Sequence, residues 1–206
     1  MWYYYAMIKP KITVTNSQQA SAAIQKALDD FMTNKFVTVG IHEDEGNHES
    51  DDITNAALGA MLDMGADIEH PGGTSYGFAS KAAADRNEVR FLKTGKGYAE
   101  LGTTGPHTIS IPARPWLSPG VATGNLEYLN IIEKAAAKGE PLDMTLNKIG
   151  VTAVGLVQKY MTDLRTPPNA ASTIKKKGSS NPLIDSGALR QSVSYKITTS
   201  KPTEGL

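Results

Sequence analysis

The chain of 206 residues contains no cysteine. Disulfide bonds, thiolate metal ligands and thiol nucleophiles are therefore excluded, and the fold must be held together by packing and hydrogen bonds. An excess of either charge is also missing, because 21 lysines and arginines balance 21 aspartates and glutamates. A balanced charge gives no overall attraction to nucleic acid or to an anionic membrane, so any contact with DNA has to be local.

Long apolar runs are missing as well. The N-terminus, MWYYYAMIK, is apolar for only a few residues and has no basic segment before them, unlike a signal peptide. Nowhere does the chain reach the roughly 18 to 20 consecutive apolar residues of a membrane-spanning helix. We therefore expect a protein made in the cytoplasm, with no membrane partner. Its content of hydrophobic residues, 40%, is that of an ordinary globular protein and predicts a folded core.

Apolar periodicity predicts strands and helices in the first third of the chain. Residues 11–15 and 37–41 alternate as half-buried strands do. An apolar stripe over residues 20–31 predicts a helix between them. A second helix is expected over residues 53–64, with acidic residues before it and Gly65 ending it. Its buried stripe is expected to consist of Ile53, Ala56, Ala57, Ala60, Met61 and Met64.

The second half of the chain predicts two strands and two longer helices. Residues 108–111 and 193–197 have strand-like alternation, whereas residues 126–137 and 146–164 carry apolar stripes with helical spacing. The pair Pro167-Pro168 ends the second helix, because proline provides no amide donor. We expect one α+β domain over the whole chain, with a small, mostly antiparallel sheet packed against several helices.

The central segment, residues 66–107, is rich in glycine and contains a single strand-like piece, residues 89–93. Structureless loops much longer than about 15 residues are uncommon in compact domains, so a segment of this length is either functional or ordered by something else. A neighbouring subunit could supply that order. We therefore expect a long loop insertion that gains its shape from a second copy, and a flexible tail at residues 200–206.

Two segments together resemble a known family. One is IPARPWLSP, residues 111–119, and the other is PPNAASTIKKKGSSNPLIDSGALRQSV, residues 167–193. Tail-completion or neck proteins of tailed phages, similar to the lambdoid tail-component and virion-morphogenesis families, typically show a proline-rich start, Ser-Thr-Ile with basic residues, and then Pro-Leu-Ile-Asp-Thr-Gly-x-Leu-Arg. Ser186 stands here where the family has threonine. HPGGT (residues 70–74) and GPHTI (residues 105–109) are similar to family versions with a long central insertion.

The resemblance implies a structural subunit of the virion and no enzyme. Such a subunit forms a ring at the junction between the DNA-filled head and the tail, hexameric to match the tail or else dodecameric. Its partners would be other neck, connector, terminator or tail-tube proteins, with non-specific contact to packaged DNA. It would be assembled in the host cytoplasm, be located in the virion and need no cofactor. A tail-terminator or connector ring is the nearest alternative.

The proline-rich segment offers candidate interface residues. Its prolines preorganise an extended arm, which reduces the entropy lost on docking, and Trp and Arg are favoured at interfaces. One interpretation is an arm that binds a partner. The alternative is that Trp116 and Leu117 cover the core of their own domain. The predicted interface comprises Arg114, Pro115, Trp116, Leu117, Tyr76 and Tyr98.

Residues 167–182 are polar and are expected to project into solvent as a basic loop. Lys175, Lys176 and Lys177 could meet DNA phosphates in the lumen of a ring, or acidic residues of a neighbouring ring. The alternative is a solvated loop tip, because three charges without interleaved aromatics carry little affinity. For Asp185-Ser186-Gly187 we expect helix capping and a tight turn, not catalysis.

A different class of function would rest on the segment HEDEGNHESDD, residues 42–52. Its histidines and carboxylates could coordinate a divalent cation, as a metal-dependent hydrolase requires. The spacing fits no metal motif, because His42 and His48 are six residues apart and not the four that place two imidazoles on one helix face. We therefore predict a solvated loop, no metal site and no catalytic residue. His70-Pro71-Gly72-Gly73 is predicted to be a turn.

Overall fold

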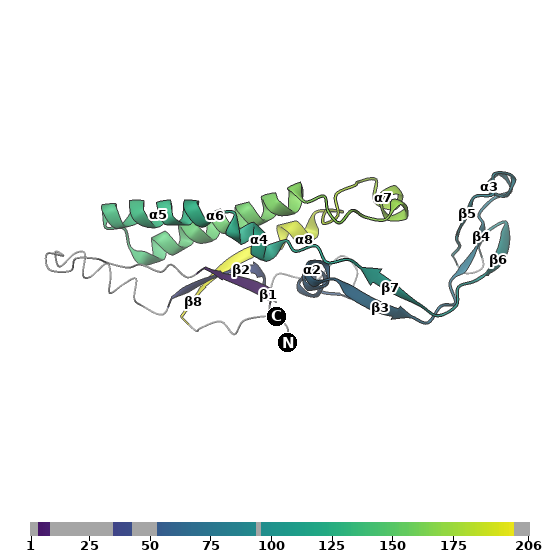
Figure 1. The fold of residues 1–206 in the computed structure, drawn as a ribbon, viewed down its shortest axis with the longest axis horizontal. Helices are drawn as coiled ribbons and strands as arrows, with labels where there is room; N and C mark the ends of the chain where they lie inside the picture. Colours follow the sequence, from purple (N-terminus) through teal and green to yellow (C-terminus); the bar gives the residue numbers. More distant parts are fainter. Residues whose placement is uncertain (1–3, 9–34, 43–52, 94–95, 200–206) are drawn as a thin grey trace. The chain divides into compact units, whose positions relative to one another are not determined.

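The computed structural model describes residues 4–8, 35–42, 53–93 and 96–199 (Figure 1). The chain divides into two compact units: the first comprises residues up to Gly65 and from Pro112 onward, and the second runs from Ala66 to Ile111. The elements expected at residues 11–15, 20–31 and 200–206 lie outside the described residues.

The first unit contains an antiparallel sheet with the strand order β1-β2-β8. Its strands are β1 (Tyr4–Ile8), β2 (Phe36–Ile41) and β8 (Ser194–Thr198). The strands expected near residues 37–41 and 193–197 are therefore confirmed, and so is the α+β class. Alternation along the central strand β2 places the side chains of Val37, Val39 and Ile41 in the core.

Three helices of the first unit follow one another in sequence: α4 (Leu117–Ala122), α5 (Asn125–Lys138) and α6 (Leu142–Asp163). They confirm the two long helices that the sequence predicts. Figure 1 shows α5 and α6 running alongside each other. Helix α6 lies directly on the sheet, because Gly150 leaves room for the ring of Tyr195 and the Tyr195 hydroxyl donates to Asn147 Oδ1 at 2.8 Å. None of the helices that the structure describes is both long and apolar enough to cross a bilayer.

Helix α2 (Asn55–Met64) ends before Gly65 as expected, but the predicted buried stripe is wrong. Thr54 caps the helix, since its Oγ1 accepts from Ala57 N at 3.1 Å. The fully buried positions are Asn55, Gly59 and Asp63, which share one face at i, i+4 and i+8. Met64, expected inside, is 54% exposed. The buried face is small and polar because of the segment that packs on it.

That segment is the chain just before α4, and Trp116 is its largest side chain. A Cβ atom at Gly59 would lie 2.9 Å from Ile41 Cδ1 and 3.2 Å from Trp116 Cζ2, so only glycine lets the indole approach α2 this closely. The indole Nε1 donates to Gly59 O at 3.0 Å. The close packing selects a glycine in the middle of a helix, where it is otherwise unfavourable, and the hydrogen bond to its carbonyl fixes the position of the indole.

The backbone of the same segment is also bound to α2. Asp63 Oδ1 accepts from Trp116 N at 2.7 Å and from Leu117 N at 3.1 Å, and Arg114 N donates to Leu62 O at 2.8 Å. We call these contacts, with the Trp116 indole bond to Gly59, the α2 brace. Because Trp116 does not cap α4 with its own side chain, the carboxylate of Asp63 satisfies the amides at the start of that helix.

The second unit is built from strands, which corrects the expectation of a long loop at residues 66–107. A two-stranded ribbon pairs β3 (Ala66–His70) with β7 (His107–Ile111). The chain then forms a three-stranded sheet with the order β5-β4-β6 and a short helix. These elements are β4 (Ser75–Phe78), α3 (Lys81–Asp85), β5 (Val89–Phe91) and β6 (Ala99–Thr103).

The junction between ribbon and sheet confirms the predicted turn at residues 70–73. Gly72 and Gly73 both have positive φ, 82° and 81°, a conformation that favours glycine. Gly72 N donates to His70 Nδ1 at 3.0 Å, and the rings of His70 and His107 stack with centroids 4.9 Å apart. The strands near residues 89–93 and 108–111 are also confirmed.

From the contacts of the α2 brace we predict that replacing Asp63 strongly lowers the free energy of unfolding. Changing Asp63→Ala removes the acceptor of two buried backbone amides and should lower the free energy of unfolding by about 3 kcal/mol. Asp63→Asn keeps an oxygen acceptor without the charge and should cost about half as much. Urea unfolding followed by tryptophan fluorescence measures both. Equal losses for the two variants would contradict the role given to the acceptor.

Candidate functional site

The predicted interface residues of the proline-rich segment lie inside the first unit. Trp116 is 0% exposed and Leu117 1%, so the expectation of an arm that offers them to a partner is wrong. The alternative, that they cover the core of their own domain, is what the structure has. Arg114 is buried as well, and Pro115 is the one predicted interface residue of this segment that is exposed.

The guanidinium of Arg114 holds the start of the basic segment. Its Nε donates to Pro167 O at 2.8 Å, and its Nη2 donates to Pro168 O at 3.1 Å and to Asn169 Oδ1 at 3.4 Å. Burial lowers the pKa of Arg114 from its ordinary value. The side chain therefore acts as an internal clamp between the two segments that carry the family resemblance.

The basic segment, residues 167–182, is not a free loop. It contains α7 (Ala171–Lys177), and Asn181 ties its far end to α6 by donating from Nδ2 to Thr162 O at 2.8 Å. Lys175 and Lys176 are exposed, whereas Lys177 is half-buried and donates to Asn181 O at 2.9 Å. Burial lowers the pKa of Lys177, which the negative charge of Asp185 partly offsets. The three lysines therefore do not form one contact surface.

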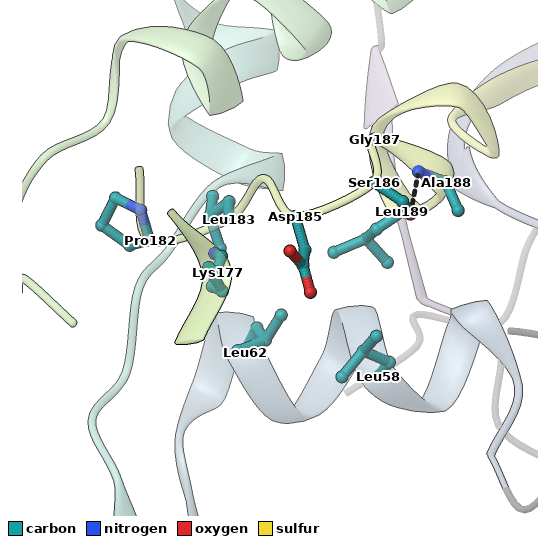
Figure 2. Close-up of a pocket in the computed structure, with 10 residues that line it drawn as sticks. All are labelled: Leu58, Leu62, Lys177, Pro182, Leu183, Asp185, Ser186, Gly187, Ala188 and Leu189. Atoms are coloured by element: carbon teal, nitrogen blue, oxygen red, sulfur yellow. Dashed lines mark hydrogen bonds between the residues drawn. The ribbon is translucent and has the colours of Figure 1, made fainter. Parts of the chain in front are cut away.

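Next to this segment lies a pocket of about 230 Å³ (Figure 2). Leu58 and Leu62 of α2 form its floor, and Leu183 and Leu189 add further apolar surface. Lys177 and Asp185 are its charged residues, and Figure 2 shows the Asp185 carboxylate directed toward the two leucines of α2. The remaining lining comes from Pro182, Ser186, Gly187 and Ala188.

The pocket wall is the PLIDSG sequence of the family resemblance, and most of its polar groups serve the turn itself. Asn181 Oδ1 accepts from Leu183 N at 3.0 Å and from Ile184 N at 3.1 Å. Ser186 Oγ accepts from Ala188 N at 3.3 Å, at the start of α8 (Ala188–Gln191), and Gly187 has a φ of 93°. The predicted tight turn is thus confirmed, whereas the predicted side-chain cap is wrong, because the N-cap residue of α8 is Gly187 and no side chain caps the helix.

Asp185 is the exception in this turn. Within the residues that the structure describes, its carboxylate makes neither a hydrogen bond nor an ion pair, so the predicted capping role does not apply to it. Asp185 is an exposed residue, so water solvates its charge without a protein partner. A carboxylate that faces an apolar pocket and takes no part in the turn is available to a ligand or partner. The sequence predicted that Asp185 caps a helix, and it gave no sign of the pocket that this carboxylate faces.

The second unit exposes an unusual share of its large apolar side chains. Tyr98, a predicted interface residue, is 58% exposed, while Tyr76 is half-buried with its ring over Gly102. Sequence reasoning missed the other members of this exposed set. They are Phe91 at 70%, Leu101 at 53%, Val89 at 49%, Ile109 at 41% and Ile68 at 39% exposure.

The expected acidic segment, residues 42–52, lies outside the described residues apart from His42. That histidine is buried beside the sheet, with Nδ1 2.7 Å from Ser194 Oγ and Nε2 3.2 Å from Thr38 Oγ1. Both ring nitrogens therefore have protein partners. In the described part of the chain, no group of three or more histidines and carboxylates is arranged to hold a metal ion.

No protein-family model, no curated protein and no solved structure matches the chain. The function must therefore be argued from the pocket, from the exposed surface of the second unit and from the sequence motifs.

The clamp formed by Arg114 predicts a local effect of a conservative change. Arg114→Lys keeps the charge but lacks the planar fork, in which two separate nitrogens donate to the carbonyls of Pro167 and Pro168. Amide hydrogen exchange of residues 169–181 should become at least about tenfold faster, while exchange in α5 stays unchanged. An unchanged exchange rate in residues 169–181 would contradict the clamp. Lys134→Arg, on the surface of α5, is the matched control.

Proposed function

We propose that the chain is a non-enzymatic assembly protein of a tailed-phage virion, which forms a ring at the junction between the DNA-filled head and the tail. The family resemblance supports the phage junction, and the exposed surface of the second unit supports an assembly role. Neighbouring neck, connector, terminator or tail-tube proteins are the proposed partners. A tail-terminator or connector ring would use the same surfaces.

The observation that carries this proposal is the exposure of Phe91, Tyr98, Leu101 and Val89 in one small unit. The unit consists of a two-stranded ribbon, a three-stranded sheet and one short helix, and sheets this small bury too little apolar surface to be very stable on their own. Clustered exposed apolar side chains mark sites of protein association in soluble proteins. A second unit of this kind is therefore suited to being covered by a neighbour.

Binding of packaged DNA is a smaller part of the proposal. Lys175 and Lys176 lie exposed in the last turn of α7, where basic residues interact favourably with the helix dipole. Two free lysines provide weak, non-specific attraction to phosphates and no sequence readout. They would line the lumen or face an acidic neighbouring ring.

Particle assembly tests the proposal. In a phage that encodes the chain, a stop codon early in the gene should give DNA-filled heads and separate tails in electron micrographs. Supplying the wild-type chain from a plasmid should restore joined particles, and mass spectrometry should find the chain in them. Complete, infectious particles that lack the chain would refute the proposal.

The exposed surface of the second unit is tested by Phe91→Ser in the same complementation. The variant should fold with a free energy of unfolding within about 0.5 kcal/mol of wild type, because the side chain is exposed. Its incorporation into particles should fall at least about tenfold. Leu126→Ser is the matched control, since Leu126 is 78% exposed on α5. Equal incorporation of both variants would contradict the role of this surface.

A further inference from the structure

One arginine of the chain is without a partner in the described part of the structure. Within the described residues, the Arg90 guanidinium makes neither a hydrogen bond nor an ion pair, whereas the other four arginines of the sequence bind groups of their own chain. Arg86 pairs with Glu88, Arg114 with residues 167–169, Arg165 with the carbonyls of Thr162 and Leu164, and Arg190 with Thr162 Oγ1.

Arg90 also occupies an accessible position. It lies in the middle of β5, an edge strand of the sheet β5-β4-β6, where its backbone pairs with Gly77 on one side only. Its neighbours in the strand, Val89 and Phe91, are the exposed apolar residues described above. An edge strand presents side chains of both faces to a partner that approaches along the edge. Because side chains alternate along a strand, Arg90 lies on one face of β5, and Val89 and Phe91 lie on the other. A partner that reaches around the edge would meet the arginine and the apolar groups, which are both frequent at interfaces.

The pocket beside α7 has the complementary chemistry. An arginine side chain consists of an apolar stem and a planar, charged end that binds carboxylates through two parallel hydrogen bonds. The leucine floor from Leu58 and Leu62 suits the stem. The Asp185 carboxylate, which makes neither a hydrogen bond nor an ion pair within the described residues, suits the guanidinium (Figure 2). A volume of about 230 Å³ is sufficient for one long side chain.

We propose that Arg90 of one copy of the chain enters the pocket of a second copy and pairs with its Asp185. The contact joins two different surfaces, so each copy offers an arginine to one neighbour and a pocket to the other. Contacts of this head-to-tail type build rings when the rotation between copies closes. The inference rests on the proposed ring-forming function and names the contact between its subunits.

Lys177 distinguishes a cationic occupant from an anionic one. Its ammonium lies in the same pocket and is bound to Asn181 O, so it repels an arginine and would attract a carboxylate. Lys177→Gln removes the charge and retains a donor for Asn181 O. Self-association should become about two- to fivefold tighter in this variant. Weaker association would show that the occupant is anionic and would overturn the proposal.

Charge reversal tests the pairing itself. Asp185→Arg and Arg90→Asp each place two like charges at the contact, and each should weaken self-association at least about tenfold in sedimentation equilibrium. A mixture of the two single variants should associate again, because each variant then offers its intact half to the other. An intramolecular pair of Arg90 and Asp185 would not respond to mixing, so failure to complement overturns the proposal.

Matched controls use charges outside the contact. Glu133→Arg on α5 and Lys93→Asp beside β5 reverse exposed charges of the same two units, and both should associate like wild type. Circular dichroism and urea midpoints confirm that each variant is folded. Two results would overturn this contact alone. In one, the wild-type chain self-associates and the single charge-reversal variants associate equally well; in the other, the wild-type chain does not self-associate even at millimolar concentration. Absence of the chain from virions would instead contradict the proposed function.

Discussion

The packing of the Trp116 segment on α2 is the constraint on which the rest of the first unit depends. A buried carboxylate is costly unless hydrogen bonds replace its hydration, and Asp63 meets this condition by accepting from the amides of Trp116 and Leu117. The same bonds satisfy the start of α4, which packs on α6. Helix α2 is thereby fixed to the core by polar groups, while Gly59 admits the indole that fills the space between α2 and the sheet.

The pocket is a consequence of this arrangement. Because the face of α2 with Gly59 and Asp63 is bound to the Trp116 segment, Leu58 and Leu62 are left to face the turn at residues 182–189. The side chain of Arg114 extends from the same segment and donates hydrogen bonds to the carbonyls of Pro167 and Pro168. These residues precede α7, which lies on the opposite side of the pocket. A single extended stretch of chain therefore positions both walls, although none of its residues lines the pocket.

Periodicity located α5, α6, β2 and β8 because each buries a regular apolar stripe that needs no information from elsewhere in the chain. The same argument chose the wrong face of α2, where glycine and aspartate are buried for a tryptophan more than fifty residues away. The strands β4 and β6 escaped notice because they are short and pair across about 25 residues. Asp185 and Ser186 resemble helix caps in sequence, but the N-cap residue of α8 is Gly187, and the Ser186 hydroxyl supports only the turn before the helix.

The two units of the chain differ in how they bury their apolar side chains. The buried apolar side chains of the first unit form one core, and Leu183 and Leu189 of this core line the pocket together with Leu58 and Leu62, which pack against it. The second unit has its large side chains outside and gains most from being covered. The contact proposed above would join these two unlike surfaces in different copies. Repetition of an unlike contact gives a ring when the rotation between copies closes and an open filament when it does not.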